Sequence, residues 1–434
     1  MGRIATLALA LSGLALAADP LPYESRLFAT GDGQELTVSL TLSCDGVSWD
    51  SPWDTSAVVT VKIDGAWHHD VVVHSPRVEH SFPTGPLSEG PHQMRVELSR
   101  EKSPAEQAQV VVEDSSAEDV GRREWLRRSP ILFGRPQSSG SKPLNARSDV
   151  PMLMYVTESR REDGMEYEYS VVWSNEDGGT GVFAPILMAR YGRTTDIEWV
   201  YRVRIGDDGE VLREVFQAAG HGTRVFTGLR VGDHPALQVS TDNNNLRQVD
   251  PGKEPANGLR FAMTPVLWED EGPRERVMDA HPWTYRIAWQ EMTREKGPFG
   301  AKAESTGDAK TAALGDVRDY LMVDVDLVSP AGAKWRLGAR VDGEWYWSDH
   351  GLALGAYEGS GWGRTAIELP PGTSSEAIEA VMARVSGIQK GSRATLRELS
   401  AFRLDAEFWP GKPIVEVAPE AKLGGDSLEY EWVR

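Results

Sequence analysis

The sequence predicts an all-β protein built from several β-sandwich domains. Short runs of alternating apolar and polar residues recur along the chain, and this period of two is typical of strands that are half-buried in a sheet. Turn-forming residues, including 43 glycines and 26 prolines, separate these runs. A chain of 434 residues has room for about two to four domains. We expect an immunoglobulin-like β-sandwich over residues 18–115, a central β-sandwich over 116–300 and a C-terminal jelly roll over 301–434.

Residues 1–17 have the organisation of a secretory signal peptide. Arg3 gives a positive start, an apolar run extends from Ile4 to Ala17, and this run ends in a small-residue cleavage site. The run is shorter than the roughly 20 residues of a membrane-spanning helix, so stable membrane insertion is not expected. The only cysteine, Cys44, has no partner for an internal disulfide. Export without disulfides predicts a secreted or periplasmic bacterial protein.

The charge balance excludes some partners. The chain carries 65 acidic and 46 basic residues, which gives a formal net charge of −19. Nucleic acid and anionic membranes are poor partners for such a surface, whereas neutral glycans, cationic surfaces and divalent metal ions remain open. The sequence has no Gly-x-Ser-x-Gly, His-Glu-x-x-His or Walker motif and no dinucleotide-binding fingerprint. We therefore expect no organic cofactor.

The immunoglobulin-like domain is predicted from four strand-like runs, at residues 35–42, 57–63, 70–73 and 92–98. A capping box at residues 116–119 predicts a short basic helix that ends near Arg128 and marks the domain boundary. One group of potential metal ligands lies in this domain: His68, His69, Asp70 and His74. Its members alternate across two faces of one strand, so we interpret the group as surface.

The central domain is predicted from strands at residues 165–173, 193–205 and 210–216, with Asp207-Asp-Gly209 as a hairpin turn between the last two. Asn175-Glu-Asp-Gly-Gly179 is a further turn. Trp283, Tyr285, Ile287 and Trp289 also alternate, which predicts a strand that packs an aromatic wall against the core.

Two acids on one strand are the main candidate site. Strict alternation over residues 193–205 places Asp196 and Glu198 on the same face as Arg202 and Arg204. The two carboxylates could reach the separation of about 5–9 Å used by glycosidases, or could bind one hard cation. The candidate catalytic residues are Asp196, Glu198 and His221. The candidate ligands of a divalent cation, Ca²⁺ or Mg²⁺, are Asp196, Glu198, His221, His234 and Asp242, the last of which opens the polar run Asp242-Asn-Asn-Asn245.

Structural interpretations of the same residues stand beside these. The acids could belong to a solvated sheet face that Arg202 and Arg204 neutralise. His221 lies between two glycines, as a turn residue would, and residues 243–245 suit a loop with left-handed backbone. For His234 a structural role is the stronger interpretation.

A family resemblance covers at most residues 120–300. The order Thr195-Asp-Ile-Glu-Trp-Val, His221-Gly222 and His234-Pro-Ala-Leu-Gln-Val resembles the vacuolar protein sorting-associated protein 62 family. More weakly, it is similar to necrosis-inducing secreted toxins, whose Asp-Trp-Glu motif binds a divalent cation. The resemblance thus implies a cation site. This chain departs from the pattern because it has Asp-Ile-Glu, lacks the preceding histidine and carries Asn244 near a second family histidine.

The C-terminal domain resembles the galactose-binding-like, carbohydrate-binding class in general shape. Its predicted strands lie at residues 320–327, 334–341, 344–347 and 396–404. Trp345, Trp347 and Trp362 are candidates for stacking on sugar rings, and burial in the sandwich core is the alternative.

Three functional hypotheses follow. The first is a protein that binds extracellular glycan or cell-surface material, with a divalent cation in the central domain. The second is a polysaccharide hydrolase or lyase that uses Asp196 and Glu198, with Arg193 or His221 binding the substrate. The third is a structural envelope protein without catalytic activity.

Overall fold

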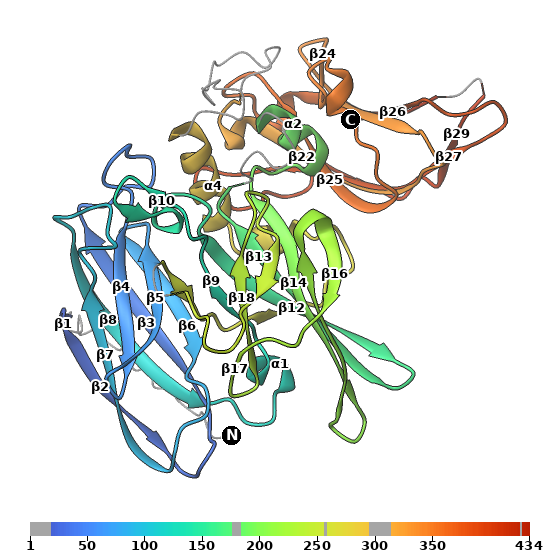
Figure 1. The fold of residues 1–434 in the computed structure, drawn as a ribbon. Coiled ribbons are helices and arrows are strands. Elements are labelled where there is room, and N and C mark those ends of the chain that lie inside the picture. Colours follow the sequence, from blue (N-terminus) through green and yellow to red (C-terminus); the bar gives the residue numbers. More distant parts are fainter. Residues whose placement is uncertain (1–18, 176–183, 256–257, 295–313, 426–427) are drawn as a thin grey trace, which may run out of the picture.

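The computed structural model describes residues 19–175, 184–255, 258–294, 314–425 and 428–434 (Figure 1). Three β-rich units follow one another along the chain, which confirms the all-β, multidomain β-sandwich class. The predicted signal peptide lies outside the described residues, as does most of the turn expected at 175–179. No helix among the described residues is long and apolar enough to cross a membrane.

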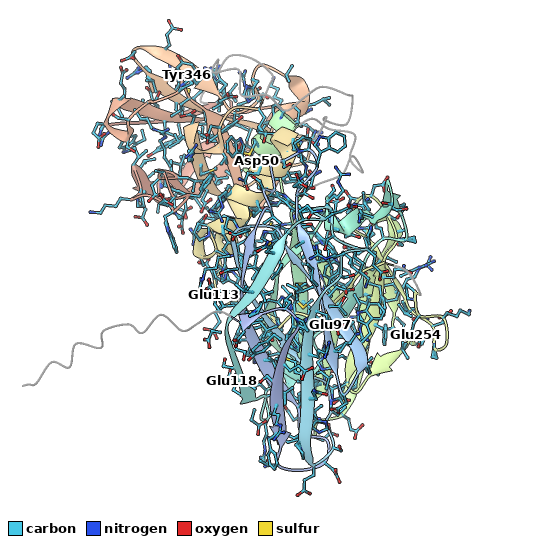
Figure 2. All side chains as sticks on the ribbon, turned by 90° about the vertical axis from the view of Figure 1, so that its left-hand side faces the viewer. Asp50, Glu97, Glu113, Glu118, Glu254 and Tyr346 are labelled. Atoms are coloured by element: carbon cyan, nitrogen blue, oxygen red, sulfur yellow. The ribbon has the colours of Figure 1, made fainter. Side chains whose placement is uncertain are left out.

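The N-terminal unit is a sandwich of two four-stranded sheets, as expected. One contains, in order, β1 (Asp19–Pro20), β8 (Gln109–Asp119), β3 (Leu36–Asp45) and β6 (Arg77–Pro83); the other contains β2 (Tyr23–Ala29), β7 (Gly90–Leu98), β4 (Ala57–Ile63) and β5 (Ala66–Val73). Alternating aliphatic residues of both sheets form a common core. Acidic side chains such as Glu97, Glu113 and Glu118 project from its strands (Figure 2).

The capping box expected at residues 116–119 is wrong. These residues continue strand β8, where Ser116 pairs with Ser39 and Asp119 with Leu36 of β3. The helix α1 (Glu124–Arg127) begins only after a turn and has no side-chain cap. Because the ladder with β3 satisfies the backbone of 116–119, local capping chemistry loses to strand pairing.

The central unit is built on one eleven-stranded sheet (Figure 1). Its main path runs through β20 (Arg260–Phe261), β9 (Ile131–Phe133), β18 (His234–Val239), β19 (Leu246–Gln248), β15 (Val211–Ala218), β14 (Asp196–Gly206), β13 (Gly164–Trp173), β12 (Pro151–Arg161) and β21 (Val266–Leu267), with β16 (Gly222–Val225) on β15 and β17 (Arg230–Val231) on β18. β10 (Ser138–Ser139) and β11 (Lys142–Pro143) form a separate hairpin. The predicted hairpin between β14 and β15 is confirmed.

The strand expected at residues 283–289 is wrong, because this segment forms helix α4 (Trp283–Arg294). Its buried residues recur at helical rather than strand spacing: Thr284, Tyr285, Ile287, Ala288, Glu291 and Met292. The aromatic alternation was therefore coincidental. Helix α2 (Ala184–Tyr191) lies beside the C-terminal unit (Figure 1), and helix α3 (Arg276–Ala280) contacts that unit through Asp279.

The C-terminal unit is a second sandwich. One sheet contains β25 (Gly361–Glu368), β22 (Tyr320–Val328), β27 (Ala394–Arg403) and β28 (Val415–Val417), with β29 (Ala421–Leu423) on β27; the other contains β24 (Glu344–Trp347), β23 (Lys334–Val341), β26 (Ile378–Ser386) and β30 (Glu429–Val433). Short 3-10 helices connect elements along the chain: η1 (Leu144–Ala146), η2 (Ala219–His221), η3 (Val317–Asp319), η4 (Ala353–Gly355) and η5 (Ser375–Ala377).

The three units share buried contacts. Glu291 of α4 is fully buried and accepts hydrogen bonds from Trp49 Nε1 of the N-terminal sandwich (3.1 Å) and from Ser148 Oγ (2.7 Å). On the other side, Arg364 of β25 pairs with Asp279 of α3 (2.7 Å). Buried charged groups need such partners, so these contacts fix helices α3 and α4 between the sandwiches.

Candidate functional site

A β-bulge decides where the two candidate acids point. Glu198 pairs with Val171 and Trp199 with Ser170, but Tyr169 then pairs with Tyr201, so Val200 is an extra residue on β14. The bulge reverses the alternation beyond this point. As a result, Asp196 and Glu198 lie on the same sheet face as Tyr201 and not on that of Arg202 and Arg204.

The arginines have other partners. Arg202 pairs with Glu168 and lies over the Trp199 ring, 4.0 Å from its centroid. Arg204 pairs with Glu166 at 2.9 Å. The expectation of acids on an arginine-neutralised, solvated face is therefore wrong.

Amide side chains contact both acids instead. Asn244 donates from Nδ2 to Asp196 Oδ2 (3.0 Å), and Gln217 donates from Nε2 to Glu198 Oε2 (2.7 Å). All four residues are buried, and Asp196 is only 2% exposed. Asn244 reaches its position from a left-handed backbone, with φ of 46°, which asparagine tolerates better than most residues.

His221 completes the group at the surface. Its Nδ1 lies 3.6 Å from Glu198 Oε1 and 3.3 Å from Gln217 Nε2, while its Nε2 lies 3.3 Å from Asn243 Nδ2. Its side chain is 55% exposed. We refer to Asp196, Glu198, Gln217, His221, Asn243 and Asn244 as the β14 cluster.

Three oxygens of the β14 cluster have no hydrogen-bond partner among the described residues. Oε1 of Gln217, Oδ1 of Asn243 and Oδ1 of Asn244 are buried without a donor, although the amide nitrogens of the same side chains are bonded. Buried polar atoms are nearly always satisfied in proteins, and exceptions call for an explanation. Carboxylate and amide oxygens are ligands suited to Ca²⁺ or Mg²⁺, whereas an imidazole is not a typical ligand of either ion.

The acidic and histidine ligands alone are too few for a metal. In the described part of the chain, no three His, Cys, Asp or Glu side chains are placed to hold a metal ion together. A cation here would therefore need the amide oxygens as well.

Two of the predicted ligands lie apart from the β14 cluster. His234 contacts Glu35 of the N-terminal sandwich through Nε2 and Ser129 O through Nδ1 (2.7 Å) and is almost fully buried. This supports the structural interpretation of His234. Asp242 accepts from Arg135 Nη1 at 3.0 Å. Neither residue joins the cluster, because each side chain is held by a partner outside it.

Arginines behind the acids balance their charge. Burial opposes ionisation of Arg274, but Glu275, Tyr155, Glu198 and Asp196 outweigh it and raise its pKa. Arg193, once considered for substrate binding, instead donates to Glu275 Oε1 (2.9 Å) and is buried. Burial would raise the pKa of Glu275, yet Arg193 and Arg274 lower it.

Arg274 also lines a cleft between the central and C-terminal units. The cleft has a volume of about 470 Å³ and includes Tyr191, Tyr357 and Trp362 in its lining, together with Arg190 and Glu275. Of the three candidate tryptophans, Trp362 alone lines this cleft, and Arg276 lies 5.3 Å from its ring centroid. This combination suits a sugar, whose ring has both apolar faces and hydroxyl groups.

Trp345 and Trp347 occupy a different place. They point away from the sandwich core, because Tyr346 between them packs against that core. Their rings stack on each other with centroids 5.6 Å apart, over Gly338. Arg336 and Arg384 lie 4.7 and 4.8 Å from the Trp347 ring centroid, so protein groups already cover its faces. The structure thus separates this pair from Trp362.

The histidine group of the N-terminal unit is not surface. His69 and Asp70 are fully buried and His74 nearly so. His69 Nδ1 lies 2.7 Å from His68 Nδ1, and its Nε2 lies 3.1 Å from Nε2 of His80 on strand β6. The expectation failed because packing of β5 against a second sheet and the central unit covers both faces of the strand.

Neither a protein-family model nor a curated protein sequence matches the chain. Solved structures match parts of it. A CBM36-1 domain of a multidomain xylanase from the hindgut metagenome of Trinervitermes trinervoides is 13% identical, with a TM-score of 0.18, over 23% of this chain and 70% of that one. The sugar-binding EclA C-terminal domain is 11% identical, with a TM-score of 0.18, over 24% and 71%. NLPPya in complex with mannosamine is 10% identical, with a TM-score of 0.23, over 39% and 76%.

These partial likenesses are to carbohydrate-binding and sugar-bound proteins, but their low identities and TM-scores carry no argument about this chain's function. They give no support to a relation with the vacuolar protein sorting-associated protein 62 family, which stays a resemblance of short motifs.

Sequence reasoning missed two residues of the site. Gln217 follows the predicted strand 210–216, and nothing local marks its amide as a partner of Glu198. Arg274 is 76 positions after Glu198 and lies in no recognisable motif. The polar run 242–245, by contrast, was a signal in the sequence, and Asn243 and Asn244 rather than Asp242 contribute to the cluster.

Proposed function

We propose that this chain binds an extracellular glycan through a divalent cation held by the β14 cluster. The observation that carries the proposal is one cluster that combines two buried carboxylates, three amide oxygens without a hydrogen-bond partner among the described residues, and an exposed histidine. A buried unsatisfied polar group costs about 1–3 kcal/mol, and a hard cation would satisfy several at once. Ca²⁺ is the better candidate because it accepts six to eight oxygen ligands in flexible geometry.

The glycan would bind at the open side of the β14 cluster. The ligand groups of Asp196 and Asn244 are buried, whereas His221 is exposed at the rim. A cation held from the inside would keep outward positions filled by water, and sugar hydroxyl or carboxylate oxygens are ligands of the same hard class. The separate cleft lined by Trp362 and Arg274 contains no residue of the β14 cluster and would supply a ring for stacking and a charge for hydrogen bonding to a more distant part of the glycan.

Catalysis by the two acids fits the geometry less well. A retaining or inverting hydrolase needs both carboxyl groups at the substrate. Asp196 is 2% exposed and bonded to Asn244, so it cannot contact a sugar ring without rearrangement. Glu198 contacts the exposed His221, and this pair could still act in a hydrolase or lyase. An activity assay on polysaccharides tests that hypothesis.

The test compares cation and glycan binding in the mature protein. Ca²⁺ is expected to raise the unfolding temperature of the wild type, but not of Glu198→Gln or Asp196→Asn. Glycan-array binding is expected to disappear when EGTA removes the cation. Glu168→Gln is the matched control, because this carboxylate lies on the neighbouring strand and pairs with Arg202.

Three results would contradict the proposal. A wild type without any shift in Ca²⁺ or Mg²⁺ would exclude the cation. Glycan binding that persists in EGTA and in Glu198→Gln would place the sugar site elsewhere. A folded protein that retains no glycan would favour the structural envelope hypothesis.

N-terminal sequencing of exported protein, with Ala18 or Asp19 expected first, tests the proposed export.

A further inference from the structure

A second cavity lies between the N-terminal sandwich and the central unit, remote in sequence from the β14 cluster. It has a volume of about 310 Å³. Strands β5 and β6 with the loop between them supply one wall, and α4 and the start of β12 supply the other. Much of its lining is apolar, including Val72, Val78, Met152, Phe261, Met263 and Trp283. Cavities of this size and composition are the usual places for small ligands.

One flat wall is built from two rings. The imidazole of His74 stacks on the indole of Trp283, with centroids 5.8 Å apart and planes inclined by 16°. His74 is more than nine-tenths buried, and no described residue forms a hydrogen bond with its Nδ1. A buried imidazole nitrogen left without a partner indicates room for a polar group of a ligand.

One cationic side chain that lines the cavity has no acidic partner among the described residues. Asp70 pairs with Lys102 at 3.0 Å, and Arg77 pairs with Glu79 at 2.6 Å. Arg286, one helical turn after Trp283 on the same face of α4, has no ion pair or hydrogen bond in the described part of the chain. In a protein with a net charge of −19, an arginine that lines a cavity without an acidic partner is unusual.

We propose that this cavity binds a small amphipathic anion, an aromatic or short aliphatic body with a single carboxylate. The apolar body of the ligand packs with one side against the wall formed by the Trp283 and His74 rings. Its other side contacts the Val and Met side chains of the cavity. The carboxylate accepts charge-assisted hydrogen bonds from Arg286, whose guanidinium matches it in a fork-like geometry. His74 Nδ1 is the second polar contact. This site is independent of the proposed glycan and cation binding.

The experiment measures binding of 2-naphthoate and of its neutral analogue 2-naphthamide by isothermal titration calorimetry at pH 7.5. The wild type is expected to bind the naphthoate at least about tenfold more tightly than the amide, as loss of one charged hydrogen bond requires. Arg286→Gln is expected to abolish this preference while still binding both compounds weakly. Arg77→Gln is the matched control, since Arg77 lines the same cavity but already pairs with Glu79, and it should retain the preference.

Three outcomes would overturn the proposal: no binding of naphthoate by the wild type up to about 1 mM, equal affinity for acid and amide, or an unchanged preference in Arg286→Gln. Circular dichroism and the unfolding temperature of each variant establish that it is folded. Should Arg286→Gln fail to fold, Arg286→Lys serves instead, because a single ammonium loses the bidentate contact and should weaken naphthoate but not naphthamide.

Discussion

His221 Nδ1 lies 3.6 Å from Glu198 Oε1, and the backbone that brings it there is left-handed, with φ of 57° for His221 and 68° for Gly220. A left-handed histidine is uncommon and persists only where surrounding contacts enforce it. Here the contact is Asn245, whose Oδ1 accepts from the backbone N–H of Gly220 at 3.1 Å and of His221 at 3.5 Å. Asn245, the third asparagine of the polar run, therefore positions His221 although it is not itself a proposed cation ligand.

Replacing Asn245 by alanine should weaken cation binding without unfolding the protein. Loss of its hydrogen bonds is expected to lower the free energy of unfolding by about 1–2 kcal/mol. The turn would then relax and move His221 from Glu198. Calcium titration followed by thermal unfolding measures both effects. Unaltered calcium affinity in a stable Asn245→Ala protein would show that the turn does not position the histidine.

Glu291 is expected to be the most sensitive acid in the interior. Its carboxylate accepts from Trp49 Nε1, Ser148 Oγ and the backbone N–H of Asp149, so Glu291→Ala leaves several buried donors unsatisfied. The expected loss is about 3–5 kcal/mol, measured by urea unfolding. Glu124→Ala, which removes a partly exposed pair with Arg128, should cost under about 1 kcal/mol. Equal losses would mean that Glu291 is not the link between the two units.

Trp347 should matter for stability and not for sugar binding. Its ring lies over Gly338 between arginine side chains, so Trp347→Ala is expected to lower the free energy of unfolding by about 2 kcal/mol. Trp409→Ala, at an exposed position, is the control and should have little effect. Glycan retention should survive in Trp347→Ala and fall in Trp362→Ala. The reverse pattern would return the binding surface to the Trp345 and Trp347 pair.

Acid should destabilise the N-terminal and central units through buried histidines. Burial, together with the nearby charge of Arg286, lowers the pKa of His74 to about 4, and burial lowers that of His80 to about 4. An unfolded histidine binds its proton below about pH 6.5, so the unfolded state binds more protons and stability falls as pH decreases from about 6.5 to 4.

The substitution His74→Phe isolates one of these histidines. Between pH 7.5 and 5 the variant should lose about 2 kcal/mol less of its free energy of unfolding than the wild type. Val78→Ala, in the same cavity and without a titratable group, should lower stability equally at both pH values. Identical pH profiles for His74→Phe and the wild type would mean that His74 does not lose a proton on folding.

Periodicity predicted strands correctly at 165–173, 320–327 and 334–341, where residues two apart pack into one core. Two of these strands also bury residues of their other face, which alternation does not require. At 283–289 the same reasoning failed. Four aromatic or aliphatic residues alternate there, but the buried set also includes Thr284, Ala288 and Glu291, whose burial depends on partners such as Trp49 far away in sequence.

The candidate site was only partly accessible to sequence reasoning. Glu198 does lie beside His221, whereas Asp196 contacts Asn244 of the polar run, and alternation assigned both acids the wrong neighbours. A bulge at Val200 has no reliable local signal, since it depends on the register with β13. His234 failed as a ligand for a similar reason, because Glu35, 199 positions earlier, takes its Nε2.

The sequence by itself determined the β class, most strand positions and the short list of polar residues from which the β14 cluster is drawn, because alternation and turn chemistry act over a few residues. The tertiary structure alone decided which of those residues meet, that Gln217 and Asn244 contact the two acids, and that Arg286 lines a cavity in which no described residue is its acidic partner. Those outcomes depend on strand register and on packing between units, which bring together groups separated by tens to hundreds of residues and which no local pattern encodes.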